Sequence, residues 1–595
     1  MNKVYVIDIE TNGFLHEFDT IWCIVMKDVD TGEVLKFGPS ELEKAKDLLV
    51  GAKGLIGHNI IMFDLPALNK HLGLNLSVFN KHIFDTLIAS RLLQPDRDGG
   101  HSLDAWGSRV GKSKLDFTDF STYSDEMLTY CARDVDVCHI IFSHVKEDIR
   151  TQYDAFKLEQ EFAQIIQYQV DNGFTLDISK VTKLYNELED EYNTLHCELK
   201  ELLPSVKDTT HYNKVVKDGL LLNEDTKGYT YETAKTKKIT YKEFKYEEPN
   251  PGSRKQLIDY FISKGWQPKE YTEKNTPKIS ETILAGMQYP EARKAARMFR
   301  LQKQMGMIQN DTGGGWLNYV RDGKVHGDVI TCGANTRRCT HSKPNLAQVD
   351  KKDIRMREVW VPREGWKLVG CDASGLELRI LGHYLAPFDH GHFAYIASQP
   401  KEKMDLHEEN RKVMGLMSRE SAKTAIYALV YGAGNMKLAS IYASDSKKHT
   451  VDIKDGYTLR RQVEDGFEGY KKLVEKVKDL YDSRGYLFAI DGGILHPRTD
   501  YSALNLLIQS AGAIVMKKAL INFYQAMTDL GYKHGVDYGL VVNVHDEFIT
   551  ECRPDMAEDV QLLARNAIRK AGKDFNLKVE LDGDARIGDN WAEVH

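Results

Sequence analysis

The sequence contains few cysteines and no long apolar run. Its eight cysteines are scattered over 595 residues without a Cys-X-X-Cys pair, a distribution that fits neither a zinc site nor a disulfide framework. No stretch reaches the roughly 20 apolar residues that a membrane helix needs, and the opening segment MNKVYVIDIE is not a secretory signal. Disorder is not indicated either, because 42% of the residues are hydrophobic. We therefore expect a cytoplasmic protein that contacts no membrane.

The length of the chain indicates several domains, and its net charge gives little information about function. A chain of 595 residues exceeds a single hydrophobic core, so several domains are expected. The formal net charge of −7 argues mildly against a nucleic-acid partner. Phosphate contact, however, depends on where Lys and Arg lie, and metal sites add acidic residues to the total. The net charge therefore does not decide the function.

The sequence pattern changes along the chain. Short strand and helix patterns alternate over residues 1–150 and predict an α/β domain, and residues 151–203 read as helical. Between 204 and 252 the apolar periodicity fades and Lys and Tyr become frequent, which indicates an inserted polar subdomain or loop. This insertion is either a solvated surface excursion or a tether for duplex backbone or a partner protein.

A first set of acidic residues lies in the N-terminal 150 residues. Asp8 and Glu10 are two apart on a predicted strand, so both face the same side, where they repel each other unless a cation lies between them. Taken alone, this pair is better explained as the solvent-facing edge of a strand. Asp64 follows an apolar strand, and Tyr130 and Asp134 share one helix face. Four carboxylates and a tyrosine are what a two-metal phosphodiester hydrolase requires.

A second set lies in the C-terminal half. KLVGCDASGLELRIL predicts a buried strand ending at Asp372, followed by a helix that carries Glu377. VVNVHDEF repeats this arrangement with His545 and Asp546. If both strands belong to one sheet, the two aspartates meet around a pair of ions about 3.5–4 Å apart, as the two-metal mechanism of polymerases requires. The alternative is two independent loop aspartates.

A helical segment between these strands carries two cations and an aromatic ring on one face. Arg419, Lys423 and Tyr427 recur every four residues in SRESAKTAIYALVYGAG, where Ser418 is a plausible N-cap and Gly432 ends the helix. Such a face suits a nucleoside triphosphate, with the cations on the phosphates and the ring against base or sugar. An amphipathic helix with a basic polar face would show the same pattern.

Together the motifs resemble two known families. DIE, NIIMFD and YCARD, with FDTLIASRLL and HSLDAWG between them, resemble proofreading exonucleases of the Asp-Glu-Asp-Asp class with a tyrosine in the last motif. DASGLELR, RESAKTAIYALVYGAG and VHDE resemble the signature motifs of family A (Pol I-like) DNA polymerases, in particular the replicative polymerases of short-tailed phages. THSKPNLAQ, LNLLIQSAGA and IGDNWAEVH extend the likeness over nearly the whole chain.

The resemblance implies a multidomain α/β and α+β protein, with a ribonuclease-H-like exonuclease domain followed by a right-hand polymerase. It would add deoxynucleotides to a primer 3′ end in phage-type genome replication, in the host cell cytoplasm if the chain is viral. The implied domains are the exonuclease (1–150), the thumb and connecting helices (151–345, with the insertion at 204–252), the palm (346–395 and 491–595) and the fingers (396–490).

The resemblance also implies metal ligands. Each active site would hold two Mg²⁺ ions, for which Mn²⁺ is a possible substitute. The exonuclease ligands would be Asp8, Glu10, Asp64 and Asp134, with Tyr130 placing the nucleophile. The polymerase ligands would be Asp372, Asp546 and the backbone carbonyl of Ala373.

Nucleotide and DNA contacts follow from the same resemblance. Tyr427 would border the base and sugar, Glu377 would exclude a ribose hydroxyl, and Lys423 is also a candidate general acid for the leaving pyrophosphate. The triphosphate would be bound by Arg419, Lys423 and His407. The primer terminus and its minor groove would be held by Arg338, Gln509 and His545.

Two features depart from the family pattern. Thr336-Arg337-Arg338 stands where the family usually has Thr-Gly-Arg, and the additional arginine is expected to strengthen contact with the DNA backbone. The 204–252 insertion is shorter than the thioredoxin-binding segment of the best-known phage relative and differs in composition, which argues against thioredoxin as the processivity factor. The expected partners are primer–template DNA and deoxynucleoside triphosphates, with a helicase-primase and another processivity factor as further possibilities.

Two alternatives remain open at this stage. A single-subunit RNA polymerase would use similar motifs, although Glu377 and an attached exonuclease argue against it. A nuclease whose polymerase half only binds DNA is the second, although Asp372, Asp546, Arg419 and Lys423 are all present.

Overall fold

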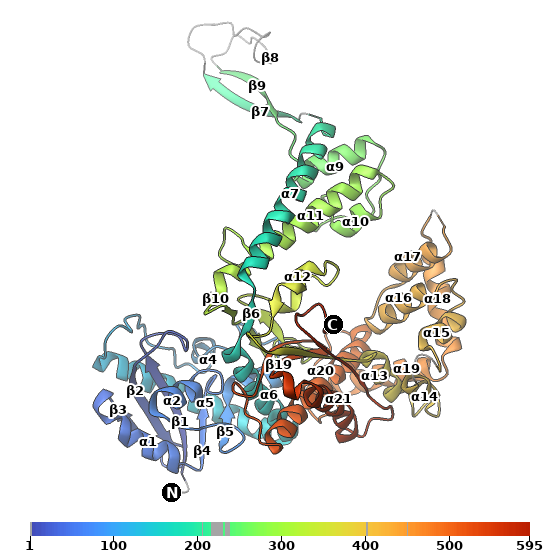
Figure 1. Cartoon of the computed structure of the whole chain (residues 1–595). Coiled ribbons are helices and arrows are strands. Elements are labelled where there is room, and N and C mark those ends of the chain that lie inside the picture. The colour runs from blue at the N-terminus through green and yellow to red at the C-terminus, as the bar shows by residue number, and fades with distance from the viewer. Residues whose placement is uncertain (1–2, 205, 216–229, 232–237, 400–402, 449) are drawn as a thin grey trace. The chain divides into compact units, whose positions relative to one another are not determined.

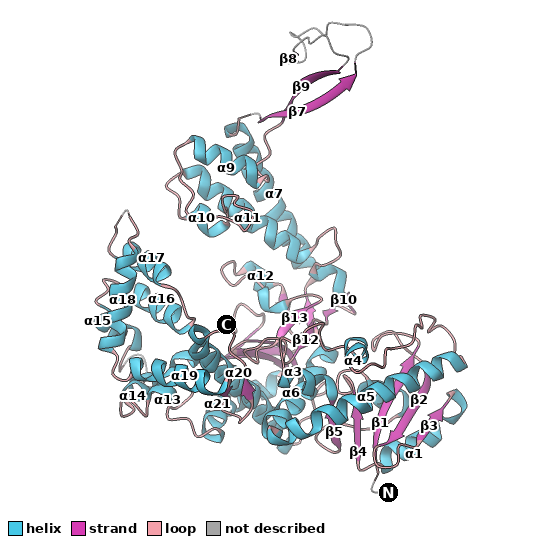
Figure 2. Cartoon of the chain, turned by 180° about the vertical axis from the view of Figure 1, so that it is seen from behind, coloured by secondary structure: helices cyan, strands magenta, loops and turns pink. Residues whose placement is uncertain are grey.

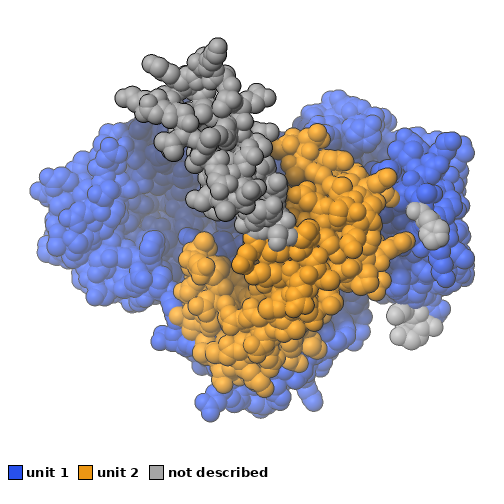
Figure 3. All heavy atoms as spheres, turned by 90° about the horizontal axis from the view of Figure 1, so that it is seen from above, with its two compact units in different colours: residues 1–176, 321–349, 360–595 blue, residues 177–320, 350–359 orange. Residues whose placement is uncertain are grey.

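The chain folds into two compact units (Figure 3). A computed structural model describes residues 3–204, 206–215, 230–231, 238–399, 403–448 and 450–595, and side chains between 205 and 247 are not described. Unit 1 comprises residues 1–176, 321–349 and 360–595, and unit 2 comprises 177–320 and 350–359.

The N-terminal part of unit 1 is an α/β fold on a five-stranded sheet (Figure 1). Its elements are β1 (Val4–Thr11), β2 (Ile21–Asp28), β3 (Val34–Phe37), η1 (Pro39–Glu41), α1 (Leu42–Gly51), β4 (Gly54–Gly57), α2 (Asp64–Leu72), β5 (His82–Asp85), α3 (Thr86–Leu93), α4 (Leu103–Arg109) and α5 (Asp125–Thr151). The strand order is β3-β2-β1-β4-β5, in which β1 is antiparallel to β2 and parallel to β4. Ser124 starts α5 by accepting a hydrogen bond from the Met127 N–H, and α5 packs across β1 and β2 (Figure 2). The predicted α/β domain is confirmed.

The C-terminal part of unit 1 contains a four-stranded antiparallel sheet. Its strands and helices are β15 (Lys367–Ala373), α13 (Leu376–Leu385), α20 (Asp500–Asp529), β18 (Tyr538–Val544), β19 (Glu547–Cys552), η4 (Pro554–Met556), α21 (Ala557–Asp574) and β20 (Gly583–Gly588). The strand order is β18-β19-β15-β20, and Asp372 lies opposite Glu547 in the β15–β19 register. The two apolar strands that lead to Asp372 and Asp546 therefore belong to one sheet, as expected.

Helix α20 forms much of the core beneath this sheet. By length and composition it is the one helix among the described residues that could cross a membrane, a possibility that the sequence analysis did not anticipate. Of its most apolar 18-residue window, however, 78% is buried inside the protein. The apolar character of α20 is therefore explained by its position in the core.

Six helices of unit 1 lie between residues 392 and 484, and α16 among them carries Arg419, Lys423 and Tyr427. They are α14 (His392–Ser398), α15 (Leu406–Met414), α16 (Arg419–Val430), α17 (Asn435–Asp445), α18 (Ile453–Gly466) and α19 (Tyr470–Arg484). Ser418 accepts a hydrogen bond of 3.0 Å from the Ser421 N–H and caps α16, which ends just before Gly432 at φ +74°. Both predicted helix boundaries are confirmed.

The remaining elements of unit 1 connect these parts. They are α6 (Tyr153–Asn172), β6 (Phe174–Leu176), β11 (Lys324–Val325), β12 (Asp328–Ile330), β13 (Thr340–Ser342), η3 (Leu346–Gln348), β14 (Trp360–Val361), β16 (Leu487–Phe488) and β17 (Ile494–Leu495), and β10 (Val320–Arg321) spans the boundary between the two units. Strand β6 pairs with β11 and β14, and β16 and β17 form a hairpin. The buried helix α6 packs against α20. Domain boundaries within the chain stay predictions.

Unit 2 is built on two long helices and a β-ribbon. Its elements are α7 (Ile178–Leu202), β7 (Val206–Val215), β8 (Thr230–Tyr231), β9 (Lys238–Glu247), α9 (Arg254–Ser263), α10 (Glu281–Ala285), α11 (Pro290–Ile308), η2 (Trp316–Tyr319) and α12 (Arg355–Glu358). Helix α11 packs along α7. β7 and β9 pair from Val206↔Glu247 to Val215↔Lys238, within the predicted insertion at 204–252. The remainder of that insertion lies mostly outside the described residues.

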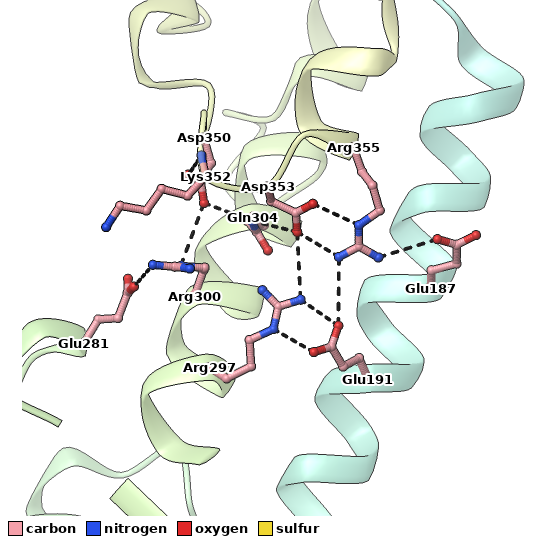
Figure 4. Close-up of polar contacts among 10 residues, drawn as sticks. All are labelled: Glu187, Glu191, Glu281, Arg297, Arg300, Gln304, Asp350, Lys352, Asp353 and Arg355. Atoms are coloured by element: carbon pink, nitrogen blue, oxygen red, sulfur yellow. Dashed lines mark hydrogen bonds and ion pairs between the residues drawn. The ribbon is translucent and has the colours of Figure 1, made fainter. Parts of the chain in front are cut away.

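An ionic network fastens residues 350–359 to the helices of unit 2 (Figure 4). The Arg297 guanidinium makes two hydrogen bonds of 2.6 and 2.7 Å to Glu191 on α7. The Arg355 guanidinium makes two of 2.9 and 2.7 Å to Asp353 and lies 3.6 Å from Glu187 on α7. The double contact of Arg297 connects α11 to α7 across 106 residues of sequence, and the Arg355–Glu187 ion pair connects α12 to α7.

Candidate active sites

The carboxylates of the first predicted set converge between β1 and α5. Asp8 and Glu10 lie on β1, Asp64 begins α2, and Asp134 lies one helical turn after Tyr130 on α5. Burial raises the pKa of Glu10 and of Asp64 to about 8, and it also raises the pKa of Asp8, to which the Glu10 charge adds. Ionised carboxylates so close together and so deeply buried repel each other strongly.

This crowding fits a site for divalent cations. Ligand atoms of Asp8, Glu10 and Cys131 lie within 4.8 Å of one another. The buried Oδ1 of Asp134 has no hydrogen-bond partner among the described residues. Carboxylate oxygens are the ligands that Mg²⁺ and Mn²⁺ prefer, and a bound cation would offset the repulsion. The donor set therefore fits the metal expected from the sequence.

One residue of this site was missed by the sequence analysis. The Lys114 ammonium lies 2.7 Å from Oδ2 of Asp134 and 4.9 Å from the centre of the Tyr130 ring. Lys114 belongs to the loop between α4 and α5, where no periodicity identifies which side chains point inward. Only the folded chain reveals this contact.

The second predicted set meets at one end of the four-stranded sheet. Asp372 lies near the end of β15, and Asp546 lies in the turn between β18 and β19. The Ala373 backbone N–H donates a hydrogen bond of 2.9 Å to the Asp546 carbonyl oxygen, which joins the two motifs directly. Burial raises the pKa of Asp546, and the Glu377 charge raises it further, whereas His545 and Arg338 act in the opposite direction.

Glu377 is held between two side chains beside this pair of aspartates. Its Oε1 accepts a hydrogen bond of 2.7 Å from Arg338 Nη2 and another from the Tyr431 hydroxyl. Burial, together with the charges of Glu377, Asp546 and Asp372, raises the pKa of the Tyr427 hydroxyl to about 12. Tyr431 was not predicted, although it continues the four-residue spacing of Arg419, Lys423 and Tyr427.

The predicted triphosphate ligands line a common cavity of about 1680 Å³. His407, Arg419 and Lys423 face it, and Ser374, directly after the Asp372-Ala373 pair, contributes to its wall. The Arg419 guanidinium pairs with Asp405, with Nε 2.7 Å from Oδ2, and the His407 ring centre lies 6.0 Å from that of Tyr427. Three predicted triphosphate ligands therefore line one cavity, which reaches the Asp372 motif through Ser374.

The predicted DNA contacts are only partly brought together. Arg338 and His545 line one small cavity with Glu547 and Ala513 of α20. Gln509 lies half-buried one helical turn before Ala513. The buried Glu547 accepts a hydrogen bond of 3.1 Å from the Trp591 indole N–H and lies 3.0 Å from Nδ1 of His595. Trp591 and His595 thus fix the side chain of Glu547, which directly follows Asp546.

Sequence comparison identifies the family. The profile of DNA polymerase family A matches residues 221–593, and a 3′-5′ exonuclease profile matches residues 5–150. The chain belongs to DNA polymerase family A. It is a DNA-directed DNA polymerase with a 3′-5′ exonuclease domain, as the motifs predicted.

Relatives of this family A polymerase match over its full length. It is 28% identical to the DNA-directed DNA polymerases of Escherichia phage T7 and Enterobacteria phage T3, in alignments that cover 99% of this chain and 100% of each relative. It is 25% identical to DNA polymerase I of Aquifex aeolicus, over 100% of this chain and 96% of that protein. The structure of the polymerase domain of Pol1 from M. smegmatis in complex with DNA primer-template and dNTP is similar in fold, with a TM-score of 0.76 at 18% identity, over 100% of this chain and 96% of that chain.

Proposed function

We propose that synthesis and proofreading take place at the two carboxylate centres and that each centre works with a pair of Mg²⁺ ions. The observation that supports the synthetic site is the hydrogen bond from Ala373 to Asp546, near the cavity that Arg419 and Lys423 line. This bond joins the backbones of the two segments that carry Asp372 and Asp546, and Ser374, which follows Ala373, lines the same cavity as Arg419 and Lys423. Family membership sets aside the RNA polymerase alternative.

Each polymerase residue has a defined task in this proposal. Asp372, Asp546 and the Ala373 carbonyl hold the cations, and Arg419, Lys423 and His407 bind the triphosphate. Bound Mg²⁺ supplies a Lewis acid that activates the attacking oxygen and offsets charge on the leaving group. Lys423 donates a proton to the leaving pyrophosphate.

Sugar and primer are selected by the groups around Glu377. Fixed by Arg338 and Tyr431, its carboxylate faces the 2′ position, where a ribose hydroxyl would clash, and Tyr427 borders the base. Arg338, Gln509 and His545 hold the primer end through its minor groove.

At the exonuclease centre, Asp8, Glu10, Asp64 and Asp134 hold the cations. The Tyr130 hydroxyl orients the water that attacks the last phosphodiester. A frayed primer end reaches this centre as a single strand, held by stacking and backbone contacts.

A pair of variants tests the division of labour. Asp546→Ala should abolish primer extension and leave degradation of single-stranded DNA intact, whereas Asp8→Ala with Glu10→Ala should do the reverse. Loss of both activities in either variant, at unchanged thermal stability, would contradict two separate centres. Failure of the second variant to extend a primer would favour the nuclease alternative.

We also propose that the enzyme replicates a phage genome in the cytoplasm of the host. Full-length similarity to the polymerases of phages T7 and T3 supports this. A helicase-primase and a processivity factor would act with it, and thioredoxin is not expected to be that factor. Product length per binding event, measured with and without thioredoxin, should not change; a severalfold increase would contradict the proposal.

A further inference from the structure

Arg337 occupies a backbone conformation that favours glycine. Its φ is +60°, in the left-handed region, at the position where the family usually has Gly. The Arg337 N–H donates to the Ala334 carbonyl at 2.9 Å, and the Ala334 N–H donates to the Arg338 carbonyl at 3.2 Å, which closes a tight turn. A long charged side chain at such a position requires a compensating environment.

That environment is a buried cluster with two cations and two anions. Arg337 is 0% exposed, and its Nη1 lies 3.8 Å from Glu159 of α6 and 3.8 Å from Asp491 of the β16–β17 hairpin. Glu159 in turn receives hydrogen bonds of 2.7 Å on both oxygens from Lys517 of α20. Formal charges balance in the cluster, so removal of one member leaves a buried charge without compensation.

The hairpin also supplies the space for the guanidinium. A Cβ on Gly493 would collide with Nη2 of Arg337, so any larger residue there would displace the guanidinium. The Ile494 carbonyl accepts from this Nη2 at 3.4 Å. Asp491 accepts from the Gly493 N–H through Oδ1, and its buried Oδ2 has no hydrogen-bond partner among the described residues. Asp491 and Gly493 thus form a set with Arg337.

Complete burial rules out the role expected for Arg337 from the sequence. A side chain with no exposed surface cannot contact the DNA backbone, so the expectation of an additional DNA contact was wrong. The next residue, Arg338, is 25% exposed in its side chain and bonds Glu377 at 2.7 Å. The two arginines of this turn therefore have different partners, Arg337 in the buried cluster and Arg338 at Glu377.

We propose that Arg337 is a positioning residue that anchors this turn in the buried cluster and thereby holds Arg338 at Glu377 and the primer end. This inference rests on the proposed contact between Arg338 and the primer. Glycine would permit the turn but would leave it without an anchor. In this polymerase the buried ion pairs of Arg337 hold the turn in one conformation, and this conformation fixes the orientation of Arg338.

The test measures primer–template affinity by fluorescence anisotropy. Arg337→Gly should weaken binding about tenfold in the otherwise unchanged enzyme, as expected when a charge-assisted contact is lost. In an Arg338→Ala background the same substitution should have no further effect, because Arg337 acts only through Arg338. Arg337→Lys, which keeps the charge but loses the planar fork, should give an intermediate affinity.

Two further variants separate positioning from stability. Adding Asp491→Asn to Arg337→Gly removes the uncompensated carboxylate and should restore the melting temperature while primer affinity stays low. Asn576→Gly, at an exposed residue with φ +52° far along the chain, relieves similar backbone strain and should leave primer affinity unchanged.

Each result decides a different point. Recovery of affinity together with melting temperature, or an equal loss in the Arg338→Ala background, would overturn the positioning role. Tight primer binding by Arg337→Gly, when Arg338→Ala binds weakly, would also overturn it while leaving the proposed role of Arg338 intact. If Arg338→Ala itself binds normally, the assignment of Arg338 fails, and this inference fails with it.

Discussion

Lys114 forms an ion pair with Asp134, with Nζ 2.7 Å from Oδ2, inside the carboxylate cluster of the N-terminal domain. The side chain of Asp134 is 4% exposed and that of Lys114 is 24% exposed, so the pair is largely shielded from water. The Lys114 ammonium thus pairs with one oxygen of Asp134, a carboxylate that we propose as a metal ligand. Lys114 and a divalent ion would compete for Asp134.

Replacing Lys114 should therefore tighten metal binding at this centre. We expect Lys114→Gln to raise the affinity for Mn²⁺ by about a factor of five, the equivalent of about 1 kcal/mol for a partly exposed pair. Calorimetric titration in an Asp372→Ala, Asp546→Ala background isolates this site. Lys112→Gln is the matched control, because Lys112 pairs with Asp136 instead, at 2.6 Å. Equal affinities in all three proteins would refute the competition.

Removal of the Tyr431 hydroxyl should weaken discrimination against ribonucleotides. In Tyr431→Phe, Glu377 keeps only its contact with Arg338, so its carboxylate is less firmly fixed against the 2′ position. We expect ribonucleotide incorporation relative to deoxynucleotide to rise by about threefold to tenfold, the equivalent of about 1 kcal/mol. Single-turnover incorporation gives the ratio. A Tyr442→Phe variant on α17 serves as control, and an unchanged ratio in Tyr431→Phe would show that the Tyr431 hydroxyl does not position Glu377 for sugar selection.

The ionic network of unit 2 should contribute measurably to its stability. Arg355→Ala removes the contacts to Asp353 and Glu187, and we expect it to lower the free energy of unfolding of unit 2 by about 1 kcal/mol. Hydrogen exchange in α7 and α11 measures this loss, which should shrink at high salt. Lys183→Ala is the control, because its ion pair with Glu187 is long, at 3.9 Å, and its side chain is 80% exposed. Equal protection in both variants would show that the network does not stabilise the unit.

Acid should destabilise unit 1 through His534. Burial lowers the pKa of His534 to about 4, with Arg363 adding to the effect, and its Nε2 accepts a hydrogen bond from the Leu540 N–H. The unfolded chain binds a proton near pH 6.5 whereas the folded chain does not, so stability is lost as the pH falls from 6.5 towards 4. Between pH 7 and 5 the loss should be about 2 kcal/mol.

Urea unfolding at both pH values tests this effect. His534→Gln, which can still accept from Leu540, should lose about 2 kcal/mol less stability between pH 7 and 5 than the parent enzyme. The same pH dependence in both proteins would assign the effect to other groups.

Local patterns in the sequence located the acidic residues of both proposed centres. Apolar strands that end in Asp372 or lead to Asp546, and a strand that carries Asp8 and Glu10, are readable because strand period and burial act over a few residues. The four-residue spacing of Arg419, Lys423 and Tyr427 is also a local pattern. Adding four more residues to this spacing would have predicted Tyr431. Motif order along the chain then identified the family.

The tertiary structure alone decided which charged groups are paired and which are buried. Lys114 and Asp134 are 20 residues apart, and Arg337 meets Glu159 and Asp491 from segments more than 150 residues away on either side. From the sequence alone, an arginine is expected at the surface. Its buried partners cannot be predicted, because residues that only folding brings together show no local periodicity. The cost of burying charge makes such partners necessary, but only the folded chain shows which residues provide them.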